Sequence, residues 1–523
     1  MPVDSMPVDS GSLDPDTSPE RRRRLRMLRA SLMAVTLLIA MDQTILATAV
    51  PAIIGSLGGA GMLGWVFASY TLAMTLAMPI AGRLGDLHGR RRLFLGAVAA
   101  FTVSSVACGL ATSMPAFLAA RFAQGLAGGA IAVLTQAVAA DAVAARYRAR
   151  FQAPIGAVFA VASVAGPLLG GALTDTVGWR WIFLVNAPIG LVAFGLAVAT
   201  VPRSGPATDR ERFDTLGAAL LCGWLTGVVV LAAVGGSTFA WRSPEVTGLA
   251  AVTLLLAAAY VVQARRTPHP VIPVAVIASR TFAVCAVLSF VTGAGVFAVI
   301  GYAPGLMQAV YGLSASESGL VILPMVVGIL AGSYLSGYLV SRTGRYRWFP
   351  VVGCVISGAG LARLAMLQPD SPLWAAPLGT LGLGLGMGLF GQVVTVAVQN
   401  AAPHRVVASA TSATHLVREL GIAVGAAALG GLFAARLAAG LGGRADLAAL
   451  SPEQIHTLPG GGDAVYAAAY LGAFGPLLLG LVGVFVVGAV VALWLPERPL
   501  ADTLPGADDA HDDDLDVEAL ASP

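Results

Sequence analysis

The chain has 523 residues, of which 57% are hydrophobic and only 11% are charged. Because an ordinary soluble protein has roughly 25% charged residues, this composition excludes a soluble globular enzyme and a disordered chain, and it indicates a multi-span membrane protein. The net charge of +3 hides a segregation: residues 1–20 hold five acids and no base, residues 499–523 hold eight acids and no base, and the 31 arginines lie between them with 15 acids.

Fourteen apolar stretches are long enough to cross a bilayer. A spanning helix needs about 20 apolar residues, and we divide the chain at charges, prolines and glycine clusters. The pattern predicts an all-α integral membrane protein with fourteen transmembrane helices. These cover 31–52, 64–83, 93–113, 115–140, 151–174, 181–200, 214–236, 245–264, 281–310, 316–341, 347–367, 373–400, 405–437 and 470–494.

The arginines indicate how the helices are oriented. Cytoplasmic loops of membrane proteins are enriched in Lys and Arg, and alternate loops here carry 24 of the 31 arginines, beginning with Arg21–Arg24. The others are Arg180, Arg242, Arg436 and Arg444 on the opposite side and Arg121, Arg363 and Arg418 within spans. We therefore expect both termini to be cytoplasmic.

An internal repeat predicts two halves. The pattern Gly-x-Leu-x-x-x-x-Gly-Arg occurs at 82–90 and again at 337–345, eight spans later and on the same predicted side. Parallel repeats of this kind are a transporter architecture. The predicted segments are a disordered acidic and basic tail at 1–28, a six-helix bundle at 29–200, an inserted helix pair at 201–269, a second six-helix bundle at 270–496 and an acidic tail at 497–523.

Asp42 lies in the first span and is the only charged residue between residues 30 and 82. A carboxylate near the middle of a span costs about 2.5–3.5 kcal/mol on insertion scales. We expect it to be a protonatable or cation-pairing group that lines a polar cavity. The alternative is a carboxylate that ties its helix to a neighbour.

A turn rich in glycine and arginine follows the second span. Gly82 and Gly89 allow a tight turn, while Arg90 and Arg91 anchor the inner face. Asp86 is suited to cap the N-terminus of a neighbouring helix. The alternative is a generic positively charged loop.

The fourth span carries Arg121 and Gln124, which are three residues apart and share a helix face. A membrane-embedded Arg needs an anionic or carbonyl partner. The alternative is that Arg121 extends to the outer surface, since it lies only six residues into the predicted span.

The fifth span is rich in residues that lack bulk or bend a helix. These residues are Gly166, Pro167, Gly170 and Gly171. They allow neighbouring helices to approach closely or to slide.

The thirteenth span holds His415, Arg418 and Glu419 about 15 Å deep, given ten residues at 1.5 Å each. His415 and Glu419 are four residues apart and share a face. This cluster is either a second titratable site or a structural pair of Arg418 with a carboxylate on another helix.

Together these segments resemble the major facilitator superfamily, and more narrowly its fourteen-helix drug:proton antiporters of the QacA/EmrB type. The resemblance covers residues 25–496. Leu87 stands where a basic residue is usual, Ala162 where a glycine is usual, and Glu419 beside an Arg that usually has a neutral neighbour. The segments that carry it are 42–51 (the LDxT…ALP motif), 82–91 (GxLaDrxGrr), 118–125 (RxxqG), 162–171 (gxxxGPxxGG), 178–188 and 213–217.

The resemblance implies a proton-coupled efflux transporter that exports amphipathic, cationic or hydrophobic compounds by alternating access. The proton-coupling candidates are Asp42, Arg121, His415, Arg418 and Glu419. The gating candidates are Gly82, Asp86, Gly89, Arg90, Arg91, Gly166, Pro167, Gly170 and Gly171. The candidates for the substrate cavity are Gln43, Trp65, Tyr70, Gln124, Phe297, Tyr302 and Gln308.

Two alternatives keep the fold: an exporter of an endogenous metabolite or lipid, and a proton-symporting importer. The expected partners are a small-molecule substrate, protons and the lipid bilayer, with no nucleic acid, and we expect a monomer in the plasma membrane. We expect neither enzymatic activity nor a cofactor or metal. A chain without Lys cannot form a nucleotide-binding P-loop, which argues against ATP-driven transport.

Overall fold

The structure is a computed structural model that describes residues 19–58, 63–202, 213–235, 239, 241–313, 317–318, 320–403, 406–441 and 462–500. The helices of the first part are α1 (Pro19–Leu57), α2 (Leu63–His88), α3 (Arg90–Gly109), α4 (Met114–Ala142), α5 (Ala145–Thr176), α6 (Trp181–Leu184), α7 (Asn186–Thr200), α8 (Thr215–Val234) and α9 (Pro244–Arg266). They are followed by α10 (Val274–Ala278), α11 (Arg280–Tyr311), α13 (Leu323–Thr343), α14 (Trp348–Ala365), α15 (Ala375–Ala401), α16 (Val407–Gly440) and α19 (Gly462–Ala492).

The described residues form helices and no β-strand, which confirms the all-α class. Within them, eleven helices are long and apolar enough to cross a membrane by length and composition. The helices α1, α5 and α11 are also long, with 39, 32 and 32 residues. Each of the predicted ranges overlaps a helix of the structure.

One boundary differs from the prediction. Helix α1 begins at Pro19, so residues 19–28 are helical rather than part of a disordered tail. Arginine is a good helix former, and the arginine run therefore extends the first helix. The predicted helix 181–200 corresponds to one apolar span, Trp181–Thr200, within which α6 ends at Leu184 and α7 begins at Asn186. Pro188 lacks the N–H that would bond to the carbonyl of Leu184, and Val185 between them keeps helical dihedral angles. Residues 1–18 and 501–523 of the two tails lie outside the described residues.

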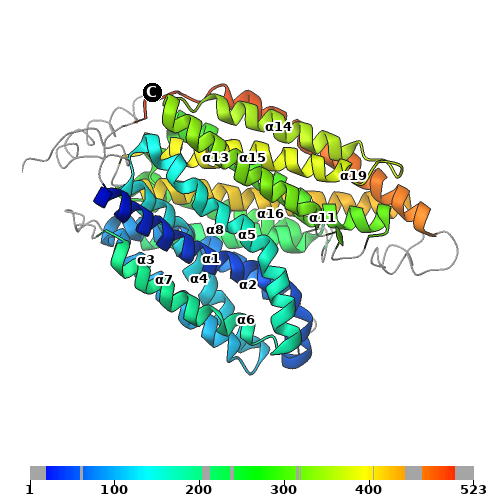
Figure 1. Cartoon of the computed structure of the whole chain (residues 1–523), viewed down its shortest axis with the longest axis horizontal. Helices are drawn as coiled ribbons and strands as arrows, with labels where there is room; N and C mark the ends of the chain where they lie inside the picture. The colour runs from blue at the N-terminus through cyan, green and yellow to red at the C-terminus, as the bar shows by residue number, and fades with distance from the viewer. Residues whose placement is uncertain are drawn as a thin grey trace, which may run out of the picture.

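Figure 1 shows α1–α7 as one group of helices and α11–α19 as a second group. The two groups lie close together at the end that carries the start of α1 and the C-terminus, and they diverge toward the opposite end. The fold therefore brings helix ends from both halves into contact on the side of the molecule that carries the start of α1, and these are called the inner ends below.

Glycines set the helix crossings within each half. A Cβ at Gly129 of α4 would lie 2.2 Å from the carbonyl oxygen of Met74 in α2, and a Cβ at Gly388 of α15 would lie 2.3 Å from that of Ile329 in α13. Backbones approach this closely only where side chains are absent. The second and fourth long helices of each half thus cross in the same way, as an internal repeat requires.

Candidate functional site

Asp42 lies at the centre of a buried polar cluster that joins α1 to α4. Its side chain is fully buried, and Arg121 is 1% exposed. Arg121 Nη1 donates to Asp42 Oδ2 at 2.7 Å and to Gln124 Oε1 at 2.8 Å, while Gln124 Nε2 donates to Asp42 Oδ1 at 2.8 Å. Arg121 therefore has an anionic partner and does not extend to the outer surface.

Helices α3 and α7 complete the cluster. Asn186 Nδ2 donates to Asp42 Oδ1 at 3.2 Å and to Ser105 Oγ at 3.0 Å. Cys108 Sγ lies 3.5 Å from Gln124 Oε1. The sequence does not predict Ser105 or Cys108 as site residues, and it includes Asn186 only in the motif at 178–188. Asn186 is 144 residues from Asp42, so their contact is a product of the fold.

Aromatic rings enclose the charged pair. The guanidinium carbon of Arg121 lies 4.3 Å from the ring centroid of Tyr70 and 5.7 Å from that of Phe183. A cation over an aromatic face is stabilised by the negative potential of the ring. Because the surroundings exclude water, the attraction between Arg121 and Asp42 is much less screened than it is at a protein surface.

The cluster corrects three expectations. In this conformation Asp42 does not line an open cavity, because its carboxylate is enclosed by hydrogen-bond donors. Gln124 and Tyr70 do not form a cavity wall, since they are 0% and 3% exposed and belong to the same cluster. Gln124 lies one turn from Arg121 on α4, so both side chains face Asp42.

Of the remaining cavity candidates, Gln43 adjoins the cluster through a side-chain interaction with Tyr70, and the others lie elsewhere. Trp65 is 52% exposed on α2, and Gln43 Nε2 lies 3.4 Å from the sulfur of Met74. Tyr302 packs at 4.9 Å from Phe433 in an aromatic group of α11, α16 and α19, and Gln308 Nε2 donates to Ser318 Oγ at 2.9 Å. The side chain of Phe297 lies outside the described residues.

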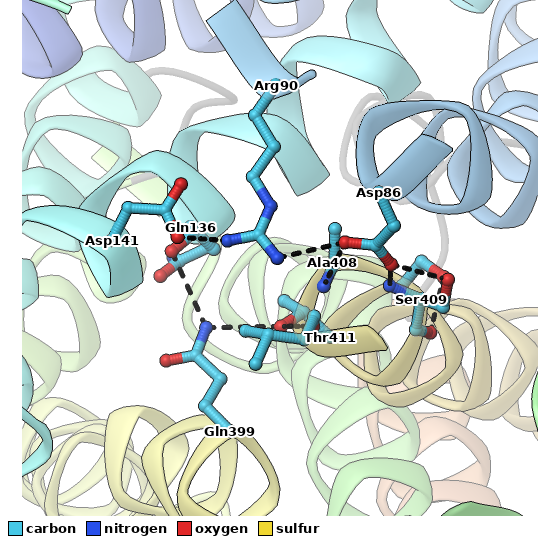
Figure 2. A network of polar contacts seen from close by, with 10 residues as sticks. Asp86, Arg90, Gln136, Asp141, Gln399, Ala408, Ser409 and Thr411 are labelled. Carbon is cyan, nitrogen blue, oxygen red and sulfur yellow. Dashed lines mark hydrogen bonds and ion pairs between the residues drawn. The ribbon is translucent and has the colours of Figure 1, made fainter. Parts of the chain in front are cut away.

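A second polar network joins the two halves at their inner ends (Figure 2). Asp86 at the end of α2 accepts from the backbone N–H of Ala408 at 3.2 Å and of Ser409 at 2.9 Å, and from Ser409 Oγ at 2.7 Å. It thus caps the N-terminus of α16, where a carboxylate is favoured by the helix dipole. Arg90 bridges Asp86, at 2.9 Å, and Asp141 of α4.

Further contacts between the halves lie beside this cap. Gln399 Nε2 of α15 donates to Thr411 Oγ1 at 3.1 Å and contacts the carbonyl of Gln136 in α4 at 3.5 Å. A Cβ at Gly82 would lie 2.7 Å from Ser412 Oγ. The inner ends of α2 and α4 are therefore held against α15 and α16.

The second copy of the repeated motif, at 337–345, also contacts the other half of the molecule, but there the contacting side chain is a cation rather than an anion. Arg146 at the start of α5 donates to the carbonyls of Ser341 and Arg342 at 3.0 and 3.1 Å. A Cβ at Gly337 would lie 3.0 Å from the backbone of Ala149. Here a cation interacts with the C-terminal end of α13, whereas Asp86 interacts with the N-terminal end of α16.

The other gating candidates are not part of the contact between the halves, and those with described contacts interact within the first half. Gly89 has a φ of 89°, which permits the turn between α2 and α3. Arg91 donates to the carbonyls of Val198, at 2.6 Å, and Val201, at 2.7 Å, so it binds α7 of its own half. A Cβ at Gly166 would lie 2.0 Å from Thr44 Oγ1, at the crossing of α5 and α1. Gly170 is buried, Gly171 faces open space, and the side chain of Pro167 lies outside the described residues.

The cluster of the thirteenth span lies on α16. His415 is 8% exposed, and Arg418 Nη2 lies 3.4 Å from Glu419 Oε1, with side-chain exposures of 40% and 15%. The pair lies within one helix rather than across two helices. Among the described residues, no three His, Cys, Asp or Glu side chains are placed to hold a metal ion.

Apolar spanning helices in two groups, crossed at glycines and joined at one end, define a multi-pass membrane transporter. The family model of the Major Facilitator Superfamily matches residues 32–426, and the chain belongs to this family. It is 36% identical over 504 residues, 95% of this chain and 73% of the other, to an uncharacterised MFS-type transporter of Mycobacterium tuberculosis. It is 30% identical over 416 residues, 80% of this chain and 76% of the other, to the multidrug transporter protein MdtP of Bacillus subtilis.

A solved structure shows the same fold. The proton:xylose symporter XylE superposes with a TM-score of 0.62 at 14% identity, covering 92% of this chain and 98% of that one. The protein is thus a multi-pass membrane protein of the cell membrane, and its named relatives include multidrug transporters.

Proposed function

We propose that the protein is a proton-coupled efflux transporter of the fourteen-helix group, with both termini in the cytoplasm. Two six-helix bundles, 29–200 and 270–496, flank the inserted pair at 201–269. The fourteen ranges of apolar sequence and the alternation of arginines support this topology. The name of the relative MdtP, a multidrug transporter protein, supports the transport of drugs. We propose that the substrates are small amphipathic compounds, cationic ones among them.

The observation that carries proton coupling is the buried ion pair between Asp42 and Arg121, at 2.7 Å. A buried pair of this kind is costly to form, and removing the charge of one partner leaves the other uncompensated. Protonation of Asp42 would therefore weaken its hold on α4 and favour a different packing of the bundle. In this mechanism the conformation described here contains the charged form of Asp42.

Alternating access would then link the two polar networks. With Asp42 charged, the cap of Asp86 on α16 holds the inner ends together. Proton binding at Asp42 would loosen α1 against α4, allowing the inner contacts to part and the substrate to enter from the cytoplasm. Because Asp42 is fully buried here, we propose that the proton reaches it from the outer side, toward which the two groups of helices diverge, before the inner contacts part. Proton entry and substrate entry then occur from opposite sides, as coupling requires.

The energetics suit one proton per cycle for a neutral substrate. A charge that crosses 100 mV yields about 2.3 kcal/mol, and a tenfold concentration gradient of substrate costs about 1.4 kcal/mol, so one proton can sustain a gradient of more than tenfold. Exchange of one proton for one monovalent cation moves no net charge, and the pH gradient alone then drives export: one pH unit sustains a tenfold gradient.

Liposomes with an imposed pH gradient test this function, with the organic cation ethidium as the probe. We expect the wild type to move ethidium against its gradient, and Asp42→Asn to lose at least nine-tenths of this rate. Asp175→Asn is the matched control, because Asp175 is exposed near the end of α5. Gradient-driven transport of ethidium by Asp42→Asn at the wild-type rate would reject Asp42 as the coupling group.

A further inference from the structure

Asn186, the first residue of α7, directs one more side chain at Asp42. Helix α6 ends at Leu184 and α7 begins at Asn186. Asn186 is 2% exposed, and its single amide nitrogen donates to both Asp42 Oδ1, at 3.2 Å, and Ser105 Oγ, at 3.0 Å. It is therefore a direct partner of the carboxylate from a third helix.

We propose that Asn186 is a positioning residue for proton exchange, whose amide gives the Asp42 side chain a hydrogen-bond partner in both of its protonation states. The inference rests on the proposed function, because it requires Asp42 to bind and release a proton. A charged carboxylate only accepts hydrogen bonds, whereas the protonated acid also donates one. A buried acid therefore needs a neighbour that can change from donor to acceptor.

The other two partners of Asp42 cannot make this change. Arg121 has only donors. The carbonyl oxygen of Gln124 already accepts from Arg121 Nη1 at 2.8 Å and lies 3.5 Å from Cys108 Sγ. Turning the Gln124 amide would direct its NH2 group at the guanidinium, so that two donors would face each other.

The surroundings of Asn186 allow the change. Ser105 Oγ accepts from Asn186 and donates to the carbonyl of Phe183 at 3.0 Å, and a hydroxyl can exchange these roles by rotating. When hydronium transfers a proton to Asp42 Oδ1, one O–H bond of hydronium breaks, one O–H bond forms at the carboxyl group, and water is left. A half-turn of the amide then places Asn186 Oδ1 opposite the new O–H group. Ser105 can then donate to the same oxygen. Apart from this proton transfer, only hydrogen bonds change.

The other ionisable groups around Asp42 come from three helices. Arg121 of α4 pairs with it directly, and Tyr70 of α2 and Cys108 of α3 interact with it electrostatically. None of these groups is altered by a substitution at Asn186. A change in proton binding in such a variant can therefore be assigned to the amide.

The infrared C=O band of the protonated Asp42 carboxyl tests the inference on the full chain in lipid, the band being assigned by its loss in Asp42→Asn. Asn186→Leu keeps a similar volume but can neither donate nor accept. We expect the band to move to higher frequency, because the acid loses its acceptor. We expect the pH at which half of the band is lost to rise by about one unit, since a hydrogen bond to the charged form is the stronger one.

Ser105→Ala is the second variant, for use if Asn186→Leu does not fold, and it should move the band in the same direction by less. Thr102→Val is the matched control, because Thr102 lies on the same helix and bonds only to the carbonyl of Val98. A wild-type band that does not titrate would overturn the proposed function itself. A band that titrates but keeps its position and midpoint in Asn186→Leu and Ser105→Ala would overturn the role of Asn186 alone.

Discussion

At the scale of single residues, Asp42 and Arg121 compensate each other's charge. The carboxylate accepts from three side chains, and the guanidinium also lies over an aromatic ring. Because the two charges compensate each other, the pair can be buried in the middle of an apolar bundle. The same compensation makes the pair sensitive to the loss of either charge.

Arg121→Gln should therefore destabilise the protein by about 3–5 kcal/mol, because the charged Asp42 would remain buried and unpaired. Thermal unfolding of the purified protein in detergent measures this loss. The double variant Asp42→Asn with Arg121→Gln leaves two neutral amides and should recover most of the stability. Equal stability of Arg121→Gln and the wild type would show that the pair does not hold α1 to α4.

The sequence predicted part of this cluster and not the rest. A lone acid and a lone arginine in apolar spans are costly, which marked Asp42 and Arg121 as a site. Gln124 was found by its spacing but assigned to the wrong surface. Asn186 and Ser105 carry no charge, and uncharged polar residues in spans are common, so only the fold shows that they converge on Asp42.

At the scale of helices, the contacts between the halves are made by helix ends. Asp86 caps α16 and Arg146 binds the end of α13, while Gly82 and Gly337 let the backbones approach. Interactions at helix ends are individually worth about 1 kcal/mol. Each of these helix-end contacts is therefore weak enough to break in a cycle, which suits the proposed gate.

Asp86→Ala should favour separation of the inner ends by about fivefold, because losing an N-cap costs about 1 kcal/mol. Electron-spin distance measurements between labels on the exposed positions 88 and 345 would detect a larger population of long distances. Asp175→Asn should leave the distribution unchanged. An unchanged distribution in Asp86→Ala would mean that the cap does not hold the gate.

Gly82→Val should also favour separation of the inner ends, here because of a steric clash. Its Cβ would lie 2.7 Å from Ser412 Oγ and 2.8 Å from the carbonyl of Ala408, so α2 and α16 could not remain in contact. Gly96→Val is the control, since nothing lies within 4 Å of a Cβ at that position in α3. The same label distances as in the wild type would show that this crossing is not tight.

Apolar length and the position of charges predicted the helices well, and Asp86 was recognised as suited to a cap. The partner of the cap, α16, could not be identified from the motif. The span 181–200 was predicted with the bounds that the structure has, and Pro188 interrupts its hydrogen bonding without ending it.

At the scale of the whole molecule, the distribution of arginine predicts the orientation in the membrane. A cysteine at position 242 should react with a membrane-impermeant maleimide on intact cells at least tenfold faster than a cysteine at position 345, because the two loops lie on opposite sides. Broken cells provide the control for reactivity. Faster labelling at position 345 on intact cells would reverse the topology.

The central claim is that the protein exchanges protons, which bind at Asp42, for substrate on the opposite side of the membrane. Liposomes loaded with ethidium, with no initial pH gradient and a pH-sensitive dye inside, test it most directly. As ethidium leaves, we expect protons to enter and the interior of wild-type liposomes to become acidic, while Asp42→Asn produces no pH change. Ethidium efflux without acidification in the wild type, or with alkalinisation, would contradict proton antiport.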